Sequence, residues 1–322
     1  MHLRQKKTPI SGRNLKNAPP GLHSYQKHCA KPPFQVNNRL GSVNLKTRTV
    51  RWITMDAILW QKLSGSIEWA AEEFDGVMGV SIKDLTTGDS LSVNGDEHFL
   101  AASSIKIPIL IELYKKAKAG TLDLDKEVAV PDDVKVGGTG VIKELGDVTL
   151  TLQDLITLMI TVSDNTATNI LIDTAVMDDV NATMEELGLS ATRLRRKMQD
   201  YEAIEQGKEN HSTPNEFTRL MKILHTSEGL DPWVAEQALA VLKKPKTTAI
   251  NRLLPYDLEI ASKYGNMRNS YCDIALVYHP KSPYIISVMT KYIPTDDVRK
   301  QRTIDAISEV SKTAYDHFNA TP

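Results

Sequence analysis

The order of the strand and helix patterns is the feature of this sequence that most constrains its fold. The stretch from Ser103 to about Ala249 is mostly helical in pattern, and strand patterns lie before and after it. The predicted strands are Val77–Asp84, Ser90–Val93, 258–263, 272–279 and 283–291. We therefore expect an α/β (α+β) fold, in which both ends of the chain build one antiparallel five-stranded sheet and an all-α subdomain is inserted between them.

Two amphipathic terminal helices should flank this sheet. One is predicted at about 56–73, and the other begins at Thr295, where Asp296 and Asp297 in the first turn favour the helix dipole. The apolar faces are Ile58, Leu59, Leu63, Ile67 and Ala70 in the first helix and Val298, Ile304, Ile307, Val310 and Ala314 in the last. The α/β part then comprises residues 55–102 and 250–322, and the helical part comprises residues 103–249.

Residues 1–54 differ sharply in composition from the rest. They hold eleven of the 39 basic residues and none of the 40 acidic ones, so the remainder has an acidic excess of twelve. This segment has no apolar periodicity and is predicted to be a disordered basic tail. It is either an arm or transit peptide, or an upstream artefact with the true start at Met55; we favour the second interpretation and expect no nucleic-acid partner.

Other classes of protein are disfavoured by simple counts. No stretch approaches the length of a membrane span, and no secretory signal pattern precedes Asp56, so we expect a cytoplasmic monomer; secretion stays open if the N-terminus is misassigned. Cys29 lies in the tail, so a structural disulfide with Cys272 is not expected. The eight histidines form no metal-hydrolase pattern, and we expect no metal and no other cofactor.

Three short motifs lie in order along the chain and carry the chemistry. They are Ser103–Lys106 (Ser-Ser-Ile-Lys), Ser163–Asn165 (Ser-Asp-Asn) and Lys263–Gly265 (Lys-Tyr-Gly). Each is weak alone, because a second S-x-x-K occurs by chance at Ser24–Lys27 in the tail. Over roughly residues 56–322, the ordered set resembles class A β-lactamases and the related penicillin-binding serine hydrolases.

The spacing within the first motif suits a serine nucleophile. Ser103 is predicted to open a helix, with Lys106 one turn away on the same face. A buried amine with a lowered pKa can take the proton of the serine hydroxyl, and the free amides of a helix N-terminus can bind an oxyanion. We therefore predict Ser103 as the nucleophile and Lys106 as its base.

The resemblance gives roles to the other two motifs. It implies that Ser163 passes a proton to the leaving nitrogen and that Asn165 binds the substrate amide and Lys106. Lys263, predicted at the end of a strand 258–262, would supply positive charge for the substrate carboxylate. Gly265 would allow close approach of the substrate, and the amide of Asn266 would form the oxyanion hole with that of Ser103.

One departure from the family pattern concerns substrate binding. Tyr264 stands where the family has a small hydroxyl residue, so contact with the substrate carboxylate is expected to be lost or displaced. Arg268 or Arg252 could compensate by supplying a positive charge.

The other departure concerns deacylation and lies in the loop that follows Thr192, here called the 192–211 loop. Met198 occupies the position of the family's deacylating glutamate. Arg196 keeps the basic anchor of the loop, with Asn210 in place of its acidic partner. Asp200, ahead of Glu202, is the predicted substitute base.

The resemblance implies a class A β-lactamase-type hydrolase that opens β-lactam amides through an acyl-enzyme on Ser103. Two alternatives stay open: a D-Ala peptidase or esterase of the same fold, and a penicillin-binding sensor that is acylated without turnover. In each case the partner is a small-molecule β-lactam or an acyl-D-Ala-like substrate.

Overall fold

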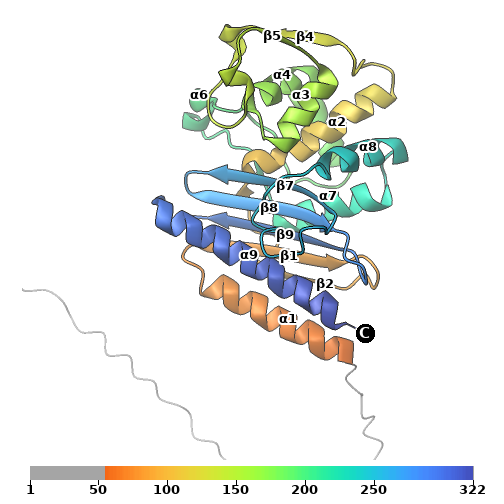
Figure 1. Ribbon diagram of the computed structural model, residues 1–322, viewed down its shortest axis with the longest axis vertical. Helices are drawn as coiled ribbons and strands as arrows, with labels where there is room; N and C mark the ends of the chain where they lie inside the picture. Colours follow the sequence, from red (N-terminus) through yellow and green to blue (C-terminus); the bar gives the residue numbers. More distant parts are fainter. Residues whose placement is uncertain (1–54, 322) are drawn as a thin grey trace, which may run out of the picture. The chain divides into compact units, whose positions relative to one another are not determined.

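A computed structural model describes residues 55–321 (Figure 1), and the tail predicted at 1–54 lies outside the described residues. Its central feature is an antiparallel five-stranded sheet in the order β2-β1-β9-β8-β7. The strands are β1 (Val77–Asp84), β2 (Ser90–Val93), β7 (Ile260–Met267), β8 (Ser270–Val277) and β9 (Tyr284–Lys291). The predicted fold class is confirmed: β1 pairs with β9, so the two ends of the chain meet inside the sheet.

The terminal helices α1 (Met55–Glu72) and α9 (Asp297–Ala320) lie side by side on one face of the sheet (Figure 1). Ile67 and Ile307 are fully buried beneath them, as their apolar faces predicted. Two residues assigned to those faces are in fact exposed, Ile58 to 37% and Val298 to 67%. Both lie in the first turn of their helix, short of the part that covers the sheet.

The inserted part is mainly helical, as predicted, and covers the opposite face of the sheet. Its helices are α2 (Lys106–Lys118), α3 (Leu152–Thr161), α4 (Asn165–Ala175), α5 (Met177–Glu186), α6 (Tyr201–Glu205), α7 (Pro214–Thr226) and α8 (Pro232–Leu242). Two small sheets were not predicted from the sequence. β4 (Glu127–Val130) pairs with β5 (Val148–Thr151) inside the inserted part, and β6 (His211–Ser212) of that part pairs with β3 (Phe99–Leu100), which precedes it. The buried apolar residues accordingly form two clusters, one on each side of the sheet.

The strand that carries the third motif is longer than the sequence indicated. β7 runs to Met267, and the hairpin turn falls at Arg268 and Asn269, so Lys263–Gly265 lies within the strand and not at its end. Glycine weakens a strand but is tolerated where another backbone approaches closely. Here that backbone is the turn that carries Ser103.

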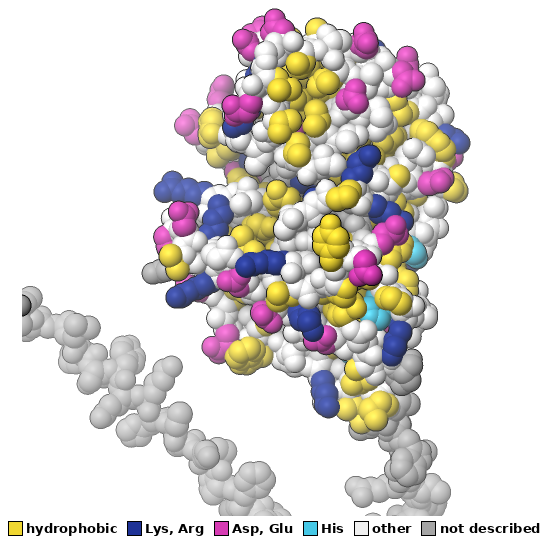
Figure 2. Space-filling view, viewed as in Figure 1, with side chains coloured by type: hydrophobic (Ala, Val, Ile, Leu, Met, Phe, Trp, Pro, Cys, Tyr) yellow, Lys and Arg dark blue, Asp and Glu magenta, His cyan; other side chains and the backbone are white. Residues whose placement is uncertain are grey.

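The surface in Figure 2 shows acidic side chains gathered at the upper end, over the part that holds β4 and β5, with most lysines and arginines lower down. Among residues 55–321, none of the helices has both the length and the apolar character needed to traverse a membrane.

Candidate active site

Ser103 lies on a tight turn between the sheet and the helical part. The turn Ala102–Ile105 is a 3-10 helix that leads directly into α2, whose first residue is Lys106. A Cβ atom placed on Gly265 would stand only 2.6 Å from the amide nitrogen of Ser103. Any residue other than glycine would therefore push β7 away from the nucleophile, so Gly265 fixes the distance between strand and serine.

The second motif forms the break between two buried helices, as predicted. Thr151 and Asp154 make a capping box at the start of α3, and Asp164 caps α4 by accepting the amide of Ala167. The second oxygen of Asp164 accepts the amides of Val141 and Ile142 at 2.7 and 2.9 Å. The aspartate of the motif is thus structural, and it ties the 137–142 loop to the turn that carries Ser163.

The 137–142 loop borders the site and was not predicted from the sequence. The hydroxyl of Thr139 donates to the carbonyl of Ser163 at 2.7 Å, and the backbone carbonyl of Thr139 accepts the backbone amide of Asn165 at 3.0 Å. The side-chain amide of Asn165 donates to the carbonyl of Gly137 at 3.1 Å. These bonds hold the side chain of Asn165 in one orientation beside Lys106.

Two buried lysines meet at the hydroxyl of Ser163. Lys106 Nζ lies 3.0 Å from Ser163 Oγ, and Lys263 Nζ lies 3.1 Å from the same oxygen. Lys106 also contacts the carbonyl of Ser163 at 2.8 Å and Asn165 Oδ1 at 3.2 Å. The structure therefore brings the lysines of the first and third motifs to the serine of the second, although they come from different parts of the chain.

Burial changes the protonation of both lysines. It lowers the pKa of Lys106 well below its usual value, and the positive charge of Lys263 lowers it further, while Asp164 opposes the shift. Burial also lowers the pKa of Lys263, to about 7. A neutral amine can accept a proton, so the site can hold one lysine neutral as a base while the other stays charged.

Lys246 and Asp273 influence the charge of Lys263, and both were missed by the sequence analysis. Lys246 lowers the pKa of Lys263 in addition to burial, whereas Asp273 opposes that shift. Asp273 is fully buried on β8, and burial raises its own pKa to about 6. One of its oxygens accepts the amide of Ile250 at 2.9 Å, and the other has no partner within residues 55–321. The charge of Lys263 thus depends on groups outside the three motifs.

Tyr264 does not point into the catalytic cleft. It lies opposite Asp273 in the β7–β8 pairing, and its ring stacks on that of Tyr271 with centroids 6.1 Å apart. The ring centroid is 4.7 Å from Lys263 Nζ, within the range of a cation–π contact. The phenol therefore covers the fully buried Lys263 on one side and does not line the cleft, and the loss or displacement of the carboxylate contact at this position stays a prediction.

The cleft beside Ser103 has a volume of about 440 Å³ and is lined by several predicted residues, namely Ser103, Asn165, Asn266 and Arg268. Arg268 is exposed at its rim and has no ion-pair partner among the described residues. Arg252, the other arginine considered, pairs with Asp305 on α9 at 2.6 Å and does not line the cleft. Arg268 alone is therefore placed to meet a substrate anion.

Three of the seven non-glycine residues with positive φ among the described residues lie at or beside this cleft. Ala102, Ser163 and Gln199 have φ angles of 45°, 55° and 60°, a region that residues other than glycine rarely occupy. Ala102 and Gln199 line the cleft, and Ser163 lies beside it. Such conformations cost roughly 1–3 kcal/mol each and persist where the surroundings enforce them.

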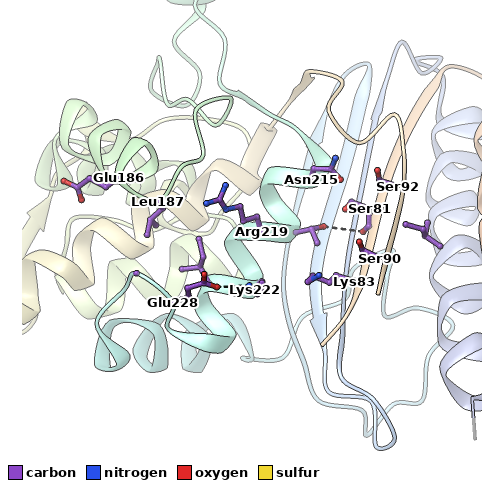
Figure 3. A pocket seen from close by; sticks show the side chains of 14 residues that line it. Ser81, Lys83, Ser90, Ser92, Glu186, Leu187, Asn215, Arg219, Lys222 and Glu228 are labelled. Atoms are coloured by element: carbon purple, nitrogen blue, oxygen red, sulfur yellow. Dashed lines mark hydrogen bonds and ion pairs between the residues drawn. The ribbon is translucent and has the colours of Figure 1, made fainter. Parts of the chain in front are cut away.

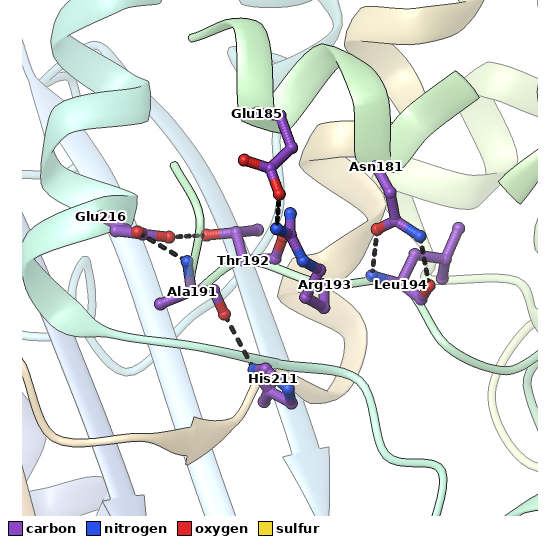
Figure 4. A network of polar contacts seen from close by, with 8 residues as sticks. All are labelled: Asn181, Glu185, Ala191, Thr192, Arg193, Leu194, His211 and Glu216. Carbon is purple, nitrogen blue, oxygen red and sulfur yellow. Dashed lines mark hydrogen bonds and ion pairs between the residues drawn. The ribbon is translucent and has the colours of Figure 1, made fainter. Parts of the chain in front are cut away.

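The start of the 192–211 loop is firmly fixed (Figure 4). Glu216 of α7 accepts the hydroxyl of Thr192 at 2.6 Å and the amide of Ala191 at 2.8 Å. Asn181 of α5 makes two bonds with the backbone of Leu194, at 2.8 and 2.9 Å. The predicted path of the chain into the loop is therefore supported from both sides by helices.

The neck of the loop corrects one prediction. Arg196 donates to Glu209 at 2.7 and 2.9 Å, so its acidic partner is the residue before Asn210. Asn210 instead accepts the backbone amides of Arg195 and Arg196, at 2.7 and 3.1 Å. The ion pair of the loop neck is retained, displaced by one position along the sequence.

The middle of the loop lacks a carboxylate in the cleft. Met198 is nearly buried. Its backbone amide donates to the side-chain oxygen of Asn169 at 2.7 Å, and its carbonyl accepts the side-chain amide of Asn169 at 3.0 Å. The carboxylate of Asp200 caps α6 by accepting the amide of Ala203 at 3.0 Å, and Glu202 accepts from Gln206 on the surface. None of the residues that line the cleft is aspartate or glutamate.

No group of three or more His, Cys, Asp or Glu side chains within the described part of the chain is arranged to hold a metal ion.

Comparison with known proteins agrees with the geometry of the cleft. Residues 60–318 match the β-lactamase enzyme family. The chain belongs to this family.

Several relatives resemble this family member over most of their length. β-Lactamase SME-1 of Serratia marcescens is 27% identical over 76% of this chain and 86% of that protein. β-Lactamase AER-1 of Aeromonas hydrophila is 25% identical over 77% and 83%. The chain is by family a β-lactamase-like hydrolase.

Solved structures show the same fold. A β-lactamase from Sphaerobacter thermophilus superposes with a TM-score of 0.72 at 29% identity, covering 82% of this chain and 98% of that one. PBP-A superposes with a TM-score of 0.73 at 26% identity, covering 81% and 97%. A mutant of PBP-A, 27% identical and with the same TM-score, was solved as an acyl-enzyme complex with penicillin G.

Proposed function

We propose that this protein is a serine hydrolase whose Ser103 is acylated by β-lactams, and that it releases the opened product slowly. The observation that carries the proposal is the buried contact of Lys106 and Lys263 with the hydroxyl of Ser163, beside Ser103 at the mouth of the cleft. Family membership supports the same class of chemistry.

Acylation follows from these contacts. Neutral Lys106 accepts the proton of Ser103 Oγ, which forms a bond to the lactam carbonyl carbon. The amides of Ser103 and Asn266 hold the oxyanion while the ring C–N bond breaks. Ser163 gives its proton to the departing nitrogen and takes the proton stored on Lys106, so both groups return to their starting state. Arg268 binds the substrate carboxylate at the rim of the cleft. The positive charge of Lys263 attracts the same carboxylate from inside the site.

Deacylation requires a base for the attacking water. Met198 cannot accept a proton, and no carboxylate lines the cleft. General-base assistance contributes typically 10²–10⁴-fold, so its loss favours an acyl-enzyme that persists.

A second candidate function is supported by this same feature. A D-Ala peptidase, esterase or penicillin sensor of the same fold would use the acylation machinery without a dedicated hydrolytic carboxylate. The likeness to PBP-A, which in one mutant form holds penicillin G covalently, supports this alternative.

Intact-protein mass spectrometry over time, after addition of a penicillin, tests the proposal. The expected result is a rapid gain of one penicillin mass followed by slow return to the free mass. A persistent adduct together with turnover of an acyl-D-Ala ester would favour the second candidate. Absence of any adduct and of any hydrolysis would refute both.

A further inference from the structure

A second cavity, of about 750 Å³, lies between α7 and the strands β1 and β2 (Figure 3). β2 is the outer strand at the end of the sheet opposite to β7, so this cavity is separated from the catalytic cleft by the width of the sheet. Its volume lies within the range of small-molecule binding sites. Nothing in the proposed hydrolysis uses it.

The floor of this cavity, made by the sheet, is polar. Ser81 and Lys83 of β1 stand opposite Ser92 and Ser90 of β2, so these four side chains share one face. The neighbouring β1 residue Ile82 points the other way, into the core beneath the terminal helices. Ser81 is nearly buried, and its backbone carbonyl accepts the hydroxyl of Thr218 of α7 at 3.4 Å. A sheet face that packs against a helix is usually apolar, so hydroxyls placed here need water or a ligand.

The helical wall adds positive charge. Arg219 and Lys222 of α7 both line the cavity, together with the hydroxyl-bearing Thr218. Arg219 donates to the carbonyl of Gly188 at 3.2 Å and makes no ion pair within residues 55–321. A Cβ on Gly188 would lie 2.9 Å from the guanidinium, so glycine at this position leaves room for the arginine to lie along the wall.

Each carboxylate that lines the cavity forms an ion pair with a lysine. Glu228 pairs with Lys222 at 2.7 Å, and Glu186 pairs with Lys115 at 3.0 Å. Asp96 lies behind Asn215, which donates to it at 2.9 Å, and does not line the cavity.

Two of the cations that line the cavity form no ion pair among residues 55–321. Within the described residues, Lys83 donates to the carbonyl of Gly88 at 2.9 Å, and Arg219 donates to the carbonyl of Gly188 at 3.2 Å. One stands on the sheet floor and the other on the helical wall, so the cavity presents positive charge from both sides (Figure 3).

We propose that this cavity binds a small polyanion, a molecule that carries phosphate or carboxylate groups, between Lys83 on the sheet and Arg219 on α7. The serine hydroxyls of the floor donate further hydrogen bonds to its polar atoms. Arginine binds such groups with two parallel bonds, which favours a planar or tetrahedral anion over a simple halide. The site is independent of the proposed hydrolysis.

Isothermal titration of the full-length protein at constant ionic strength tests this, with pyrophosphate and citrate as separate probes. We expect one or both to bind at millimolar or lower concentration. Lys83→Gln and Arg219→Gln should each weaken binding by roughly tenfold or more, because charge-assisted hydrogen bonds are lost. Lys312→Gln, an equal charge change at the exposed Lys312–Asp316 pair of α9, should leave the affinity unchanged.

Arg268→Gln separates this site from the catalytic cleft. Binding that survives in Arg268→Gln and is lost in Arg219→Gln supports the proposal. Binding lost only in Arg268→Gln would place the anion in the catalytic cleft and overturn it. If neither pyrophosphate nor citrate gave a heat of binding with the parent, the proposal would also be overturned. Equal melting temperatures of parent and variants show that all the proteins compared are folded.

Discussion

The cleft has two sides, the nucleophile side with the three motifs and the loop side formed by the 192–211 loop. They differ in how many of the reactive groups expected for the family they contain. On the nucleophile side, Lys106 and Lys263 are fully buried, and both contact the hydroxyl of Ser163. On the loop side, the backbone is held just as firmly, by Asn169 and by the Arg196–Glu209 pair, yet it presents Met198 to the cleft. The 192–211 loop is thus firmly held, but it brings no carboxylate to the cleft.

In the proposed mechanism, therefore, formation and hydrolysis of the acyl-enzyme rest on separate structural supports. Removing a group on the nucleophile side should abolish the first step, whereas changes on the loop side should alter only the second. The following predictions test that separation.

The largest effect is expected for Ser103→Ala. It removes the attacking oxygen, so covalent acylation should vanish while the melting temperature stays close to that of the parent. Mass spectrometry after addition of a penicillin measures both adduct and release. Ser24→Ala, in the second S-x-x-K of the tail, is the matched control and should be acylated normally. An adduct on the Ser103→Ala protein would remove Ser103 as the nucleophile.

Met198→Glu should restore a base on the loop side. Asn169 holds the backbone of residue 198, so the new carboxylate should enter the cleft on an unchanged chain path. We expect deacylation to accelerate by about 10²-fold or more with little change in the acylation rate. Met198→Gln, of similar size and without a basic oxygen, is the control. Equal release rates in all three proteins would show that the loop is not where hydrolysis is limited.

The pH dependence of acylation should respond to the buried charges behind the nucleophile side. Lys263, with a pKa of about 7, is charged below that pH and loses its charge above it, so acylation by a carboxylate-bearing penicillin should decline at alkaline pH. Lys246→Gln removes a neighbouring positive charge, raises the pKa of Lys263 and should move this decline to higher pH. Asp273→Asn removes a negative charge and should move it to lower pH.

Acylation rate constants measured from pH 5 to 10 in the parent and both variants test these directions, with the pH range chosen to span the pKa near 7. If the decline in acylation moved in the same pH direction in Lys246→Gln and Asp273→Asn, the electrostatic effect of these two residues on Lys263 would be contradicted. The deacylation rate serves as the internal control, because neither residue lies on the loop side.

The smallest effect is expected for Asp200→Asn. The carboxylate of Asp200 is engaged at the start of α6, and asparagine caps helices equally well. We expect acylation and deacylation to stay within about twofold of the parent. Asp200→Ala, which loses the cap, should lower stability by roughly 0.5–2 kcal/mol in chemical denaturation. If Asp200→Asn slowed deacylation by about 10²-fold, Asp200 would be the base that the sequence predicted.

Much of the fold was predictable from the sequence because the signals that set its strands and helices are local. β1 and β2 were predicted at their observed bounds from alternation and a turn, and the capping box at Thr151 marked the start of α3. The end of β7 was misjudged because Gly265 was interpreted as a strand end. The backbone that this glycine accommodates, that of Ser103, lies far away in the sequence.

The parts of the site that were missed depend on packing between distant segments. Asp273 sits within an apolar strand pattern, and only the pairing of β8 with β7 shows that it lies behind Lys263. Asn210 was predicted to stand opposite Arg196, whereas Glu209 does. The choice depends on which of these neighbouring side chains faces the loop, and this is set by the path of the folded chain. The 137–142 loop carries no motif at all, and its place beside Asn165 comes from the bonds that Asp164 makes to it.

The pairing of β1 with β9 also governs how this protein is made. Val80 of β1 meets Val288 of β9, so β1 keeps an open edge while the ribosome adds everything between them. At typical rates of translation this interval lasts roughly ten seconds or more, during which an apolar strand is available to other nascent chains. Lys263 arrives on a strand made nearly as late, and a chain that stops before it carries Ser103 without the second lysine. A chain that ends before β7 therefore lacks the third motif and leaves the edge of β1 without its partner strand β9.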